Sequence, residues 1–322
     1  ITMLNTTVII VAHKRKEFIK EAVESVLGNT QRPTEIIVVK NFSDPLIDSF
    51  LQMNKIITIN TSDESLGGKL SEGISYSSGD IIFFLEDDDL FSKEKIAHVT
   101  RMFNEYDIGF YHNAQLVFYD SHAIMNIPNN RGIFYYFRSI ESEKTLNYLI
   151  HKLKVGFNVS SIVISRNLAE KCKMLLKNVK ITADTFLFFC AVENAFPIMV
   201  DLSRLTYYRI MKRRVTNSNL NAKLFEMQYN DALYFKTIFL KKILRNNIEM
   251  SIRQRELLYK IITNKIKRTD AVIYTIRSTM DFLGLPSKWT AFLILLSSAS
   301  ILSKNLSKYL FVKMTFSNSI IS

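Results

Sequence analysis

The sequence contains few of the residues that build disulfide or zinc frameworks. Among 322 residues there are two cysteines, Cys172 and Cys190. Two cysteines provide no disulfide framework, and they suit a reducing compartment. Neither lies in a CxxC or Cys/His cluster, so we do not expect cysteine to ligate a metal.

Long apolar runs are also missing. We expect no secretory signal, because residues 1–5 lack a basic segment and the run at 8–12 is too short. The uncharged stretch at 289–302, WTAFLILLSSASIL, has 14 residues, fewer than the roughly 20 that span a bilayer. Continuing to residue 314 adds three lysines at helical spacing. A Trp at one end and lysines beside an apolar face favour a helix in the membrane interface. A core helix of a soluble domain and a true membrane span remain alternatives.

Acidic residues are scarce in the last third of the chain. Residues 203–322 hold 21 Lys and Arg against 6 Asp and Glu, a net charge of +15, whereas residues 1–202 have a net charge of −3. Such a basic block suggests an anionic membrane surface or a nucleic acid. No zinc spacing or RNA-binding motif supports the second partner, so no nucleic acid is expected.

The most informative stretch that is present is residues 79–91, GDIIFFLEDDDLF. The apolar run 81–85 predicts a strand buried on both faces. It ends in four acids, Glu86, Asp87, Asp88 and Asp89. Acids packed this closely repel one another, and a hard divalent cation such as Mg²⁺ or Mn²⁺ relieves that repulsion. The alternative is a solvated acidic loop.

Strands and helices alternate through the first half of the chain. This order predicts βαβ units and a mostly parallel sheet, with the strand ends after Ala12, Val39 and Leu85 along one edge. The polar clusters after those strands should therefore share one cleft. The predicted strands are 7–12, 35–39, 55–59, 81–85, 108–112, 115–119, 159–165, 198–202 and 205–210. The predicted helices are 17–27, 46–53, 70–77, 93–106, 168–176 and 183–192.

The remaining segments have a different character. Residues 121–155 resemble a long, partly irregular insertion. After Arg214 the pattern becomes helical and basic, with helices predicted over 222–246 and 250–280. We therefore expect a first domain over residues 1–214 and a basic all-helical region over 215–322, for which the charge suggests membrane association.

Residues 7 to about 210 resemble the family 2 glycosyltransferases, which have the GT-A fold. VIIVAHKR resembles the family's first-strand motif, and the segment AVESVLGNTQRPTEIIVVKNFSD its helix and second strand. SLGGKLSEG resembles the third conserved segment, and GDIIFFLEDDD the strand that ends in the D-x-D motif. TADTFLFFCAV resembles the segment with the acceptor-side acid, and LTYYRI the strand that closes the domain.

The resemblance implies a nucleotide-sugar donor, a divalent metal and inversion at the anomeric carbon. It makes Glu86 and Asp88 the metal ligands, turns Asp87 toward the donor ribose or sugar, and gives Asp89 a sugar or outer contact. Asp184 matches the base that takes the proton of the acceptor hydroxyl. The alternative for Asp184 is a helix N-terminal acid stabilised by the helix dipole.

The resemblance also implies a donor-binding set with several departures from the family. Family members usually pair an Asp after the second strand with the uracil ring, but here Lys40 and Asn41 stand at that motif, and Asp44 or a backbone carbonyl is a possible substitute. His13 either stacks on a base or is an ordinary loop histidine, and Lys69 either contacts phosphate or is solvated. The donor-binding candidates are Ala12, His13, Arg15, Lys40, Asn41, Lys69 and Asp87.

Two functions remain to be distinguished. The first is a metal-dependent inverting glycosyltransferase acting on a lipid-linked sugar or polysaccharide precursor, peripheral on the cytoplasmic face of the cell membrane. The second is a catalytically degenerate GT-A domain that serves as a membrane-associated scaffold. The intact acids favour the first function, and the changes at Lys40, Asn41 and Lys69 favour the second.

Overall fold

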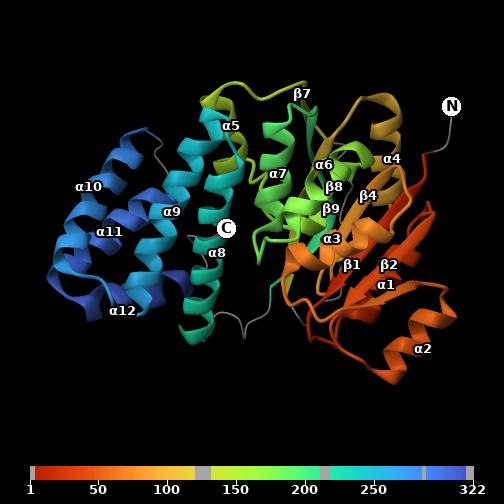
Figure 1. The fold of residues 1–322 in the computed structure, drawn as a ribbon, viewed down its shortest axis with the longest axis horizontal. Helices are drawn as coiled ribbons and strands as arrows, with labels where there is room; N and C mark the ends of the chain where they lie inside the picture. Colours follow the sequence, from red (N-terminus) through yellow and green to blue (C-terminus); the bar gives the residue numbers. More distant parts are fainter. Residues whose placement is uncertain (1–3, 120–131, 211–217, 285–287, 317–322) are drawn as a thin grey trace. The chain divides into compact units, whose positions relative to one another are not determined.

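The computed structural model of the chain describes residues 4–119, 132–210, 218–284 and 288–316. The chain forms two compact units (Figure 1). The first comprises residues 1–141 and 154–210, and the second comprises residues 142–153 and 211–322. The expected boundary at 214/215 falls in a segment outside the described residues. Residues 142–153, which we had placed in the first domain, belong to the helical unit instead.

The first unit is built on a mixed sheet of nine strands within the described residues, with the order β3-β2-β1-β4-β8-β6-β9-β5 and with β7 paired to β9. The first four strands are parallel, as predicted, whereas the pairs on both sides of β8 are antiparallel. The strands are β1 (Thr6–Ala12), β2 (Glu35–Lys40), β3 (Ile57–Asn60), β4 (Ile81–Glu86), β5 (Leu90–Phe91), β6 (Phe110–Tyr119), β7 (Phe134–Phe137), β8 (Ile162–Ser165) and β9 (Ile198–Ile210).

Helices cover both faces of this sheet, which explains why its central strands are apolar throughout. Alternate residues of a strand point to opposite faces. Val8 and Phe83 pack on one face with Val23 and Ile96, and on the other face Gly73 lies against Ile9. The helices are α1 (Ile19–Leu27), α2 (Pro45–Met53), α3 (Leu66–Tyr76), α4 (Lys95–Glu105), α6 (Arg166–Leu176) and α7 (Ala183–Glu193).

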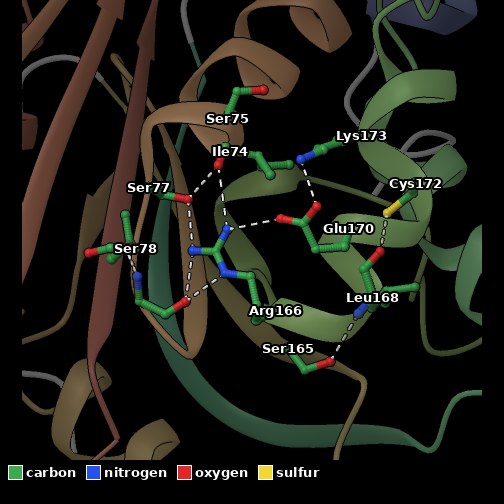
Figure 2. Close-up of polar contacts among 12 residues, drawn as sticks. Ile74, Ser75, Ser77, Ser78, Ser165, Arg166, Leu168, Glu170, Cys172 and Lys173 are labelled. Carbon is green, nitrogen blue, oxygen red and sulfur yellow. Dashed lines mark hydrogen bonds and ion pairs between the residues drawn. The ribbon is translucent and has the colours of Figure 1, made fainter.

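Arg166, the first residue of α6, binds the segment between α3 and β4. This segment lies at the end of β4 opposite to the acids. Figure 2 shows its guanidinium among the end of α3 and the residues that lead into β4. It donates to the Gly79 carbonyl at 2.9 and 2.7 Å and to Ser77 Oγ at 2.9 Å. Glu170 lies 3.6 Å from the same guanidinium. This fixes where β4 begins, and therefore where its acidic end lies.

Several elements differ from the prediction because strands pair with partners distant in the sequence. The strands predicted at 108–112 and 115–119 are one strand, β6, and those at 198–202 and 205–210 are one strand, β9, paired in parallel across an irregular register at Asn113 to Gln115. Residues 159–161 form a 3-10 turn before β8 rather than part of the strand. The predicted insertion contains β7 and α5 (Glu143–His151), and its residues 121–131 lie outside the described chain.

The second unit is helical, as expected, but its helices break elsewhere. They are α5, α8 (Ser218–Ile238), α9 (Lys242–Ile262), α10 (Arg268–Gly284), α11 (Lys288–Leu302) and α12 (Lys304–Phe316). The helix predicted over 250–280 is interrupted at Asn264, whose φ of 56° is left-handed and ends α9.

The apolar run at 289–302 is a core helix of this unit. Phe292, Leu293 and Leu296 of α11 are buried with Leu258 and Phe311. The indole of Trp289 donates to Gln254 Oε1 at 3.0 Å. Of the alternatives for this run, the structure therefore selects the core helix and corrects the interfacial one. In the parts of the chain that the structure describes, no helix has the length and apolarity needed to cross a membrane.

Candidate functional site

The carboxyl ends of β1, β2 and β4 bring the predicted polar clusters to one edge of the sheet. Ala12 lies beside Lys40 in the β1–β2 register, and Val11 lies beside Glu86 in the β1–β4 register. The prediction that these strand ends share an edge is confirmed. Ala12 is buried and contributes its backbone position rather than a side-chain group.

The acids after β4 are not a solvated loop. Asp87, Asp88 and Asp89 are 0%, 4% and 1% exposed, and only Glu86 is partly exposed. The turn is held by Asp87 N, which donates to the Val11 carbonyl at 3.1 Å, and by Asp89 N, which donates to the Glu86 carbonyl at 3.2 Å. Buried carboxylates need compensating charge or hydrogen bonds, and the structure provides both.

Arg15 supplies the compensating charge. Its guanidinium pairs with Asp87 through one nitrogen and with Asp88 through another. Burial raises the pKa of Asp87 to about 6 even though Arg15 opposes the shift. The backbone N–H of His13 also donates to Asp87 Oδ2 at 3.3 Å. Arg15 thus stands as a cation between two predicted site acids.

Arg209 of β9 clamps the acid turn from the other side. Its backbone N–H donates to Asp89 Oδ1 at 3.0 Å, and its Nε donates to the Asp88 carbonyl at 2.8 Å. The guanidinium lies 4.2 Å from the Phe18 ring centroid and bonds Glu21 Oε2 at 2.6 Å. Sequence reasoning used this strand only for the resemblance and missed Arg209 as a positioning residue.

Three of the donor-binding candidates meet beside Arg15. Lys69 Nζ lies 3.1 Å from His13 Nδ1, and Asn41 Nδ2 lies 3.4 Å from the same nitrogen. Burial and the charge of Lys69 lower the pKa of His13, so the ring is neutral and Nδ1 accepts. Burial likewise lowers the pKa of Lys69. A neutral ring, an amide and an ammonium form a polar surface next to the acids.

Lys69 lies within a helix, although the predicted helix begins only at residue 70. α3 begins at Leu66, four residues earlier than expected, and Ser65 caps it by accepting from Gly68 N at 3.0 Å. The glycines serve packing, since a Cβ on Gly67 would lie 2.2 Å from the Leu176 carbonyl oxygen. Lys69 therefore occupies the first turn of α3, where its backbone position is fixed.

Lys40 does not join this group. Its ammonium is fully buried, donates to the Phe42 carbonyl at 2.7 Å and to Asn60 Oδ1 at 2.6 Å, and pairs with Asp48 at 2.8 Å. Lys40 thus supports the β2–α2 connection, which corrects its assignment to donor binding. Asp44 is similarly occupied, because it caps α2 by accepting from the N–H groups of residues 46 and 47.

Asp184 opens α7 and is linked to the acid turn through one short segment. Asp184 Oδ2 accepts from Asn158 N at 2.9 Å, and its Oδ1 accepts from Thr185 N at 2.7 Å. Asn158 Oδ1 accepts from Ser160 N at 2.8 Å, and Ser160 Oγ accepts from Glu86 N at 3.0 Å. Burial raises the pKa of Asp184 to about 6.

Asn158, Ser160 and Lys95 are further residues that sequence reasoning missed. Asn158 has a left-handed φ of 64°, which Asn tolerates better than most residues. Lys95 is fully buried and donates to the Ser160 carbonyl at 2.6 Å and to Thr206 Oγ1 at 2.8 Å. Burial holds its pKa well below the ordinary lysine value. Because its partners lie 65 and 111 residues away, Lys95 reads in the sequence as an ordinary helix lysine.

The acid turn offers carboxylate oxygens, which are the ligand atoms that hard cations take. Among the described residues, no group of three or more His, Cys, Asp or Glu side chains is arranged to hold a metal ion. The carboxylates of Asp87 and Asp88 nevertheless converge on the cationic guanidinium of Arg15. Oxygen ligands that converge on a cation fit Mg²⁺ or Mn²⁺ chemically.

The fold and the acid turn define a GT-A glycosyltransferase, and the comparisons agree. The model of glycosyl transferase family 2 matches residues 7–167. The chain belongs to this family. An uncharacterized glycosyltransferase of Rickettsia typhi is 25% identical over 250 residues, covering 76% of this chain and 74% of the relative. An uncharacterized glycosyltransferase of Nostoc is 26% identical over 121 residues, covering 35% of this chain and 38% of the relative.

The fold is shared with solved structures of S. aureus TarS. TarS 1-349 superimposes with a TM-score of 0.56 at 14% identity, covering 97% of this chain and 91% of that chain. The same fragment in complex with UDP-GlcNAc gives a TM-score of 0.58 at 13% identity, with the same coverage. At these identities the likeness establishes the GT-A fold of the chain.

Proposed function

We propose that the protein is an inverting glycosyltransferase that moves a sugar from a nucleotide-diphosphate sugar to an acceptor hydroxyl. The observation that carries the proposal is the link between two acidic centres. The acid turn Glu86–Asp89 and the half-buried Asp184 are joined through Asn158 and Ser160. An inverting displacement needs electrostatic stabilisation of the leaving group on one side of the sugar and a base on the other.

Each side has suitable groups. Asp184, with its pKa raised to about 6, is ionised near neutral pH and accepts the proton of the acceptor hydroxyl. Arg15 and Lys69 are the cations that face donor phosphates, and His13 offers a neutral ring face to the nucleotide. Asp87 orients the donor ribose or sugar. Asp89, buried and bonded to Arg209 N, keeps the turn in shape.

Glu86 and Asp88 would hold a divalent metal, Mn²⁺ or Mg²⁺. When bound, such an ion supplies Lewis-acid stabilisation to the departing diphosphate. Arg15 balances the charges of Asp87 and Asp88, so the turn tolerates burial in the absence of any added cation.

A uridine-diphosphate sugar is the first donor to test, because TarS, which has the same fold, was solved with UDP-GlcNAc. We further propose a lipid-linked sugar or polysaccharide precursor as acceptor, at the cytoplasmic face of the cell membrane. The net charge of +15 over residues 203–322 supports that location, since anionic lipid attracts basic surfaces.

The test is release of nucleoside diphosphate from a panel of nucleotide sugars with Mn²⁺, with and without a lipid-linked acceptor. Asp88→Asn should abolish turnover and metal-dependent donor binding. The matched control is Asp80→Asn, at the exposed opposite end of β4, which should behave as the parent does. The anomeric configuration of the product, read by NMR, tests inversion. Absence of turnover with every donor would overturn the enzymatic proposal.

A degenerate scaffold is the second candidate, and the burial of Lys40 favours it, because the family's base-reading position is used for structure. Calorimetry with Mn²⁺ and nucleoside diphosphates separates the two. An active enzyme binds both, whereas a scaffold that has lost the donor site binds neither.

A further inference from the structure

The exposed face of α10 is more apolar than the face it buries. Ala271, Tyr274 and Ser278 point into the helical unit. The side chains facing solvent are Val272, Ile273, Ile276, Met280 and Leu283, which are 43%, 48%, 56%, 67% and 76% exposed. We call these five side chains the α10 stripe. A surface helix normally has the opposite distribution.

The geometry of the α10 stripe is that of one continuous surface. At 3.6 residues per turn, its members fall within an arc of about 100° around the helix axis. They extend along nearly the whole of α10, from its second turn to its last. Scattered exposed apolar residues are common on proteins, but a contiguous stripe marks an interaction site.

Cations border the α10 stripe on both sides. Arg268 and Arg277 are exposed, and they lie about 40° beyond its two edges around the axis. Lys265 and Lys267, just before the helix, are exposed as well. The two acids of α10 are half-buried and neutralised: Asp270 lies 3.6 Å from Lys260, and Asp281 lies 3.1 Å from Arg253.

We propose that the α10 stripe is the surface by which this protein inserts into the interface of an anionic phospholipid bilayer. An apolar strip with an arginine beyond each edge, and with no exposed acid on the described part of the helix, matches a helix lying in the headgroup region. Arginine stems cover apolar surface while their guanidinium groups reach lipid phosphates. A protein partner would have to offer an apolar groove with acidic rims, and a second copy of this basic face cannot provide one.

This inference deepens the membrane part of the proposed function, and it relocates that contact. The sequence pattern favoured the apolar run 289–302 as the membrane contact, but the apolar side chains of α11 are buried in the core of the unit. The less conspicuous α10 leaves the five side chains of the α10 stripe exposed. The inference needs a membrane location but not the transfer chemistry, so each can fail without the other.

The test is vesicle flotation of the full chain. Parent protein should float with phosphatidylcholine vesicles that contain about a third phosphatidylglycerol, and not with pure phosphatidylcholine, at about 0.15 M salt. The double change Ile276→Glu with Met280→Glu should lower the partition coefficient at least about tenfold. The control, Met53→Glu with Met174→Glu, alters two residues of the first unit that are 77% and 71% exposed, and it should change nothing.

A spectroscopic measurement distinguishes loss of membrane contact from loss of the fold. Both native cysteines are buried, so Ile276→Cys can carry an environment-sensitive dye. Its emission should shift to the blue with anionic vesicles, and a dye on Met53→Cys should not shift. Circular dichroism checks that the helical unit remains intact in each variant.

Three outcomes would overturn the inference. One is flotation of the Ile276→Glu, Met280→Glu variant equal to that of the parent. Another is equal binding of the parent to neutral vesicles. The third is a parent dimer, seen by light scattering, that the same double change dissociates while no flotation occurs, because the stripe would then be a subunit interface. Donor binding, measured on the same samples, reports separately on the proposed transferase.

Discussion

Two strand ends that flank β1, those of β4 and β2, use the same sheet edge in opposite ways. At the end of β4 the chain gathers three buried carboxylates and surrounds them with Arg15 and Arg209. At the end of β2, where the family usually has acids, Lys40 turns inward and pairs with Asp48. The β4 end would hold the proposed metal and diphosphate, whereas the β2 end places Asn41 beside the site.

The difference shows that a position in a family motif does not fix the direction of its side chain. Lys40 stands where a base-reading acid is expected. Its ammonium instead bonds the Phe42 carbonyl and the Asn60 side chain, and it pairs with the Asp48 carboxylate. We propose that His13 and Asn41 then contact the base. The following experiments test this division, from the largest expected effect to the smallest.

Replacement of Asp184 should have the largest effect on turnover. Asp184→Asn keeps the shape of the side chain but removes the base, so the turnover number should fall about 10²- to 10⁴-fold. The donor dissociation constant should not change. Steady-state kinetics and calorimetry measure the two quantities, and a loss below about tenfold would leave Asp184 as a helix-terminal acid.

The pH profile should show the same group titrating. Burial raises the pKa of Asp184 to about 6, so the carboxylate is present above that pH and protonated below it. Turnover should therefore fall about tenfold for each pH unit below 6. Asp87 titrates at about the same pH, so the donor dissociation constant must be measured alongside. A flat profile between pH 5 and 7 would contradict the assignment of Asp184 as the base.

Removal of Arg15 should strengthen the binding of Mn²⁺ at the β4 end. Arg15→Gln takes away the positive charge that Asp87 and Asp88 share, so Mn²⁺ affinity should rise about tenfold through stronger net attraction. Calorimetry with Mn²⁺ alone gives the readout, and exposed Lys16→Gln is the control. Weaker Mn²⁺ binding in Arg15→Gln would show that the guanidinium does not stand in for a metal ion.

Replacement of Lys40 should affect stability rather than donor binding. Lys40→Met leaves Asn60 Oδ1 and the Phe42 carbonyl without their donor, which should lower the free energy of unfolding by about 1–3 kcal/mol. Urea unfolding measures the change, with exposed Lys93→Met as the control. A tenfold change in donor affinity would place Lys40 back in the donor site.

Restoring an acid at the β2 end should have the smallest effect. Asn41→Asp keeps the oxygen that accepts from Lys14 N and supplies a charged acceptor for a base N–H. A net gain of one hydrogen bond predicts about two- to tenfold tighter binding of UDP. GDP binding serves as the comparison. Equal gains for both nucleotides would indicate that Asn41 does not face the base.

Local patterns were enough to predict the parallel half of the sheet and its active edge. Continuous apolar runs mark β1, β2 and β4, and their order along the chain leaves little freedom in how they pair. The joining of 108–112 with 115–119, and of 198–202 with 205–210, depended on the pairing of β6 with β9. That pairing is decided by tertiary contacts that no local window contains.

The site followed the same division. Asp87, Asp88 and Asp184 were predicted from their motifs, and Asp184 is linked through Asn158 and Ser160 to Glu86 N, at the start of the acid turn. The inward turn of Lys40, the capped helix under Lys69 and the buried ammonium of Lys95 depend on partners distant in the sequence. The predicted helix also began four residues late, because the close packing of Gly67 on the Leu176 carbonyl cannot be predicted from the local sequence.

The Arg209 clamp has a consequence for how this site comes into being during folding. Its bonds to Asp89 and to Glu21 join residues 120 and 188 positions apart. Closing loops of that length is entropically costly, and contacts of high sequence separation are slow to form. The acid turn therefore reaches its final geometry only after β9 has been synthesised and has docked. On a nascent chain, the Asp89 carboxylate exists for 120 residues of elongation before Arg209, from whose backbone N–H it accepts a hydrogen bond.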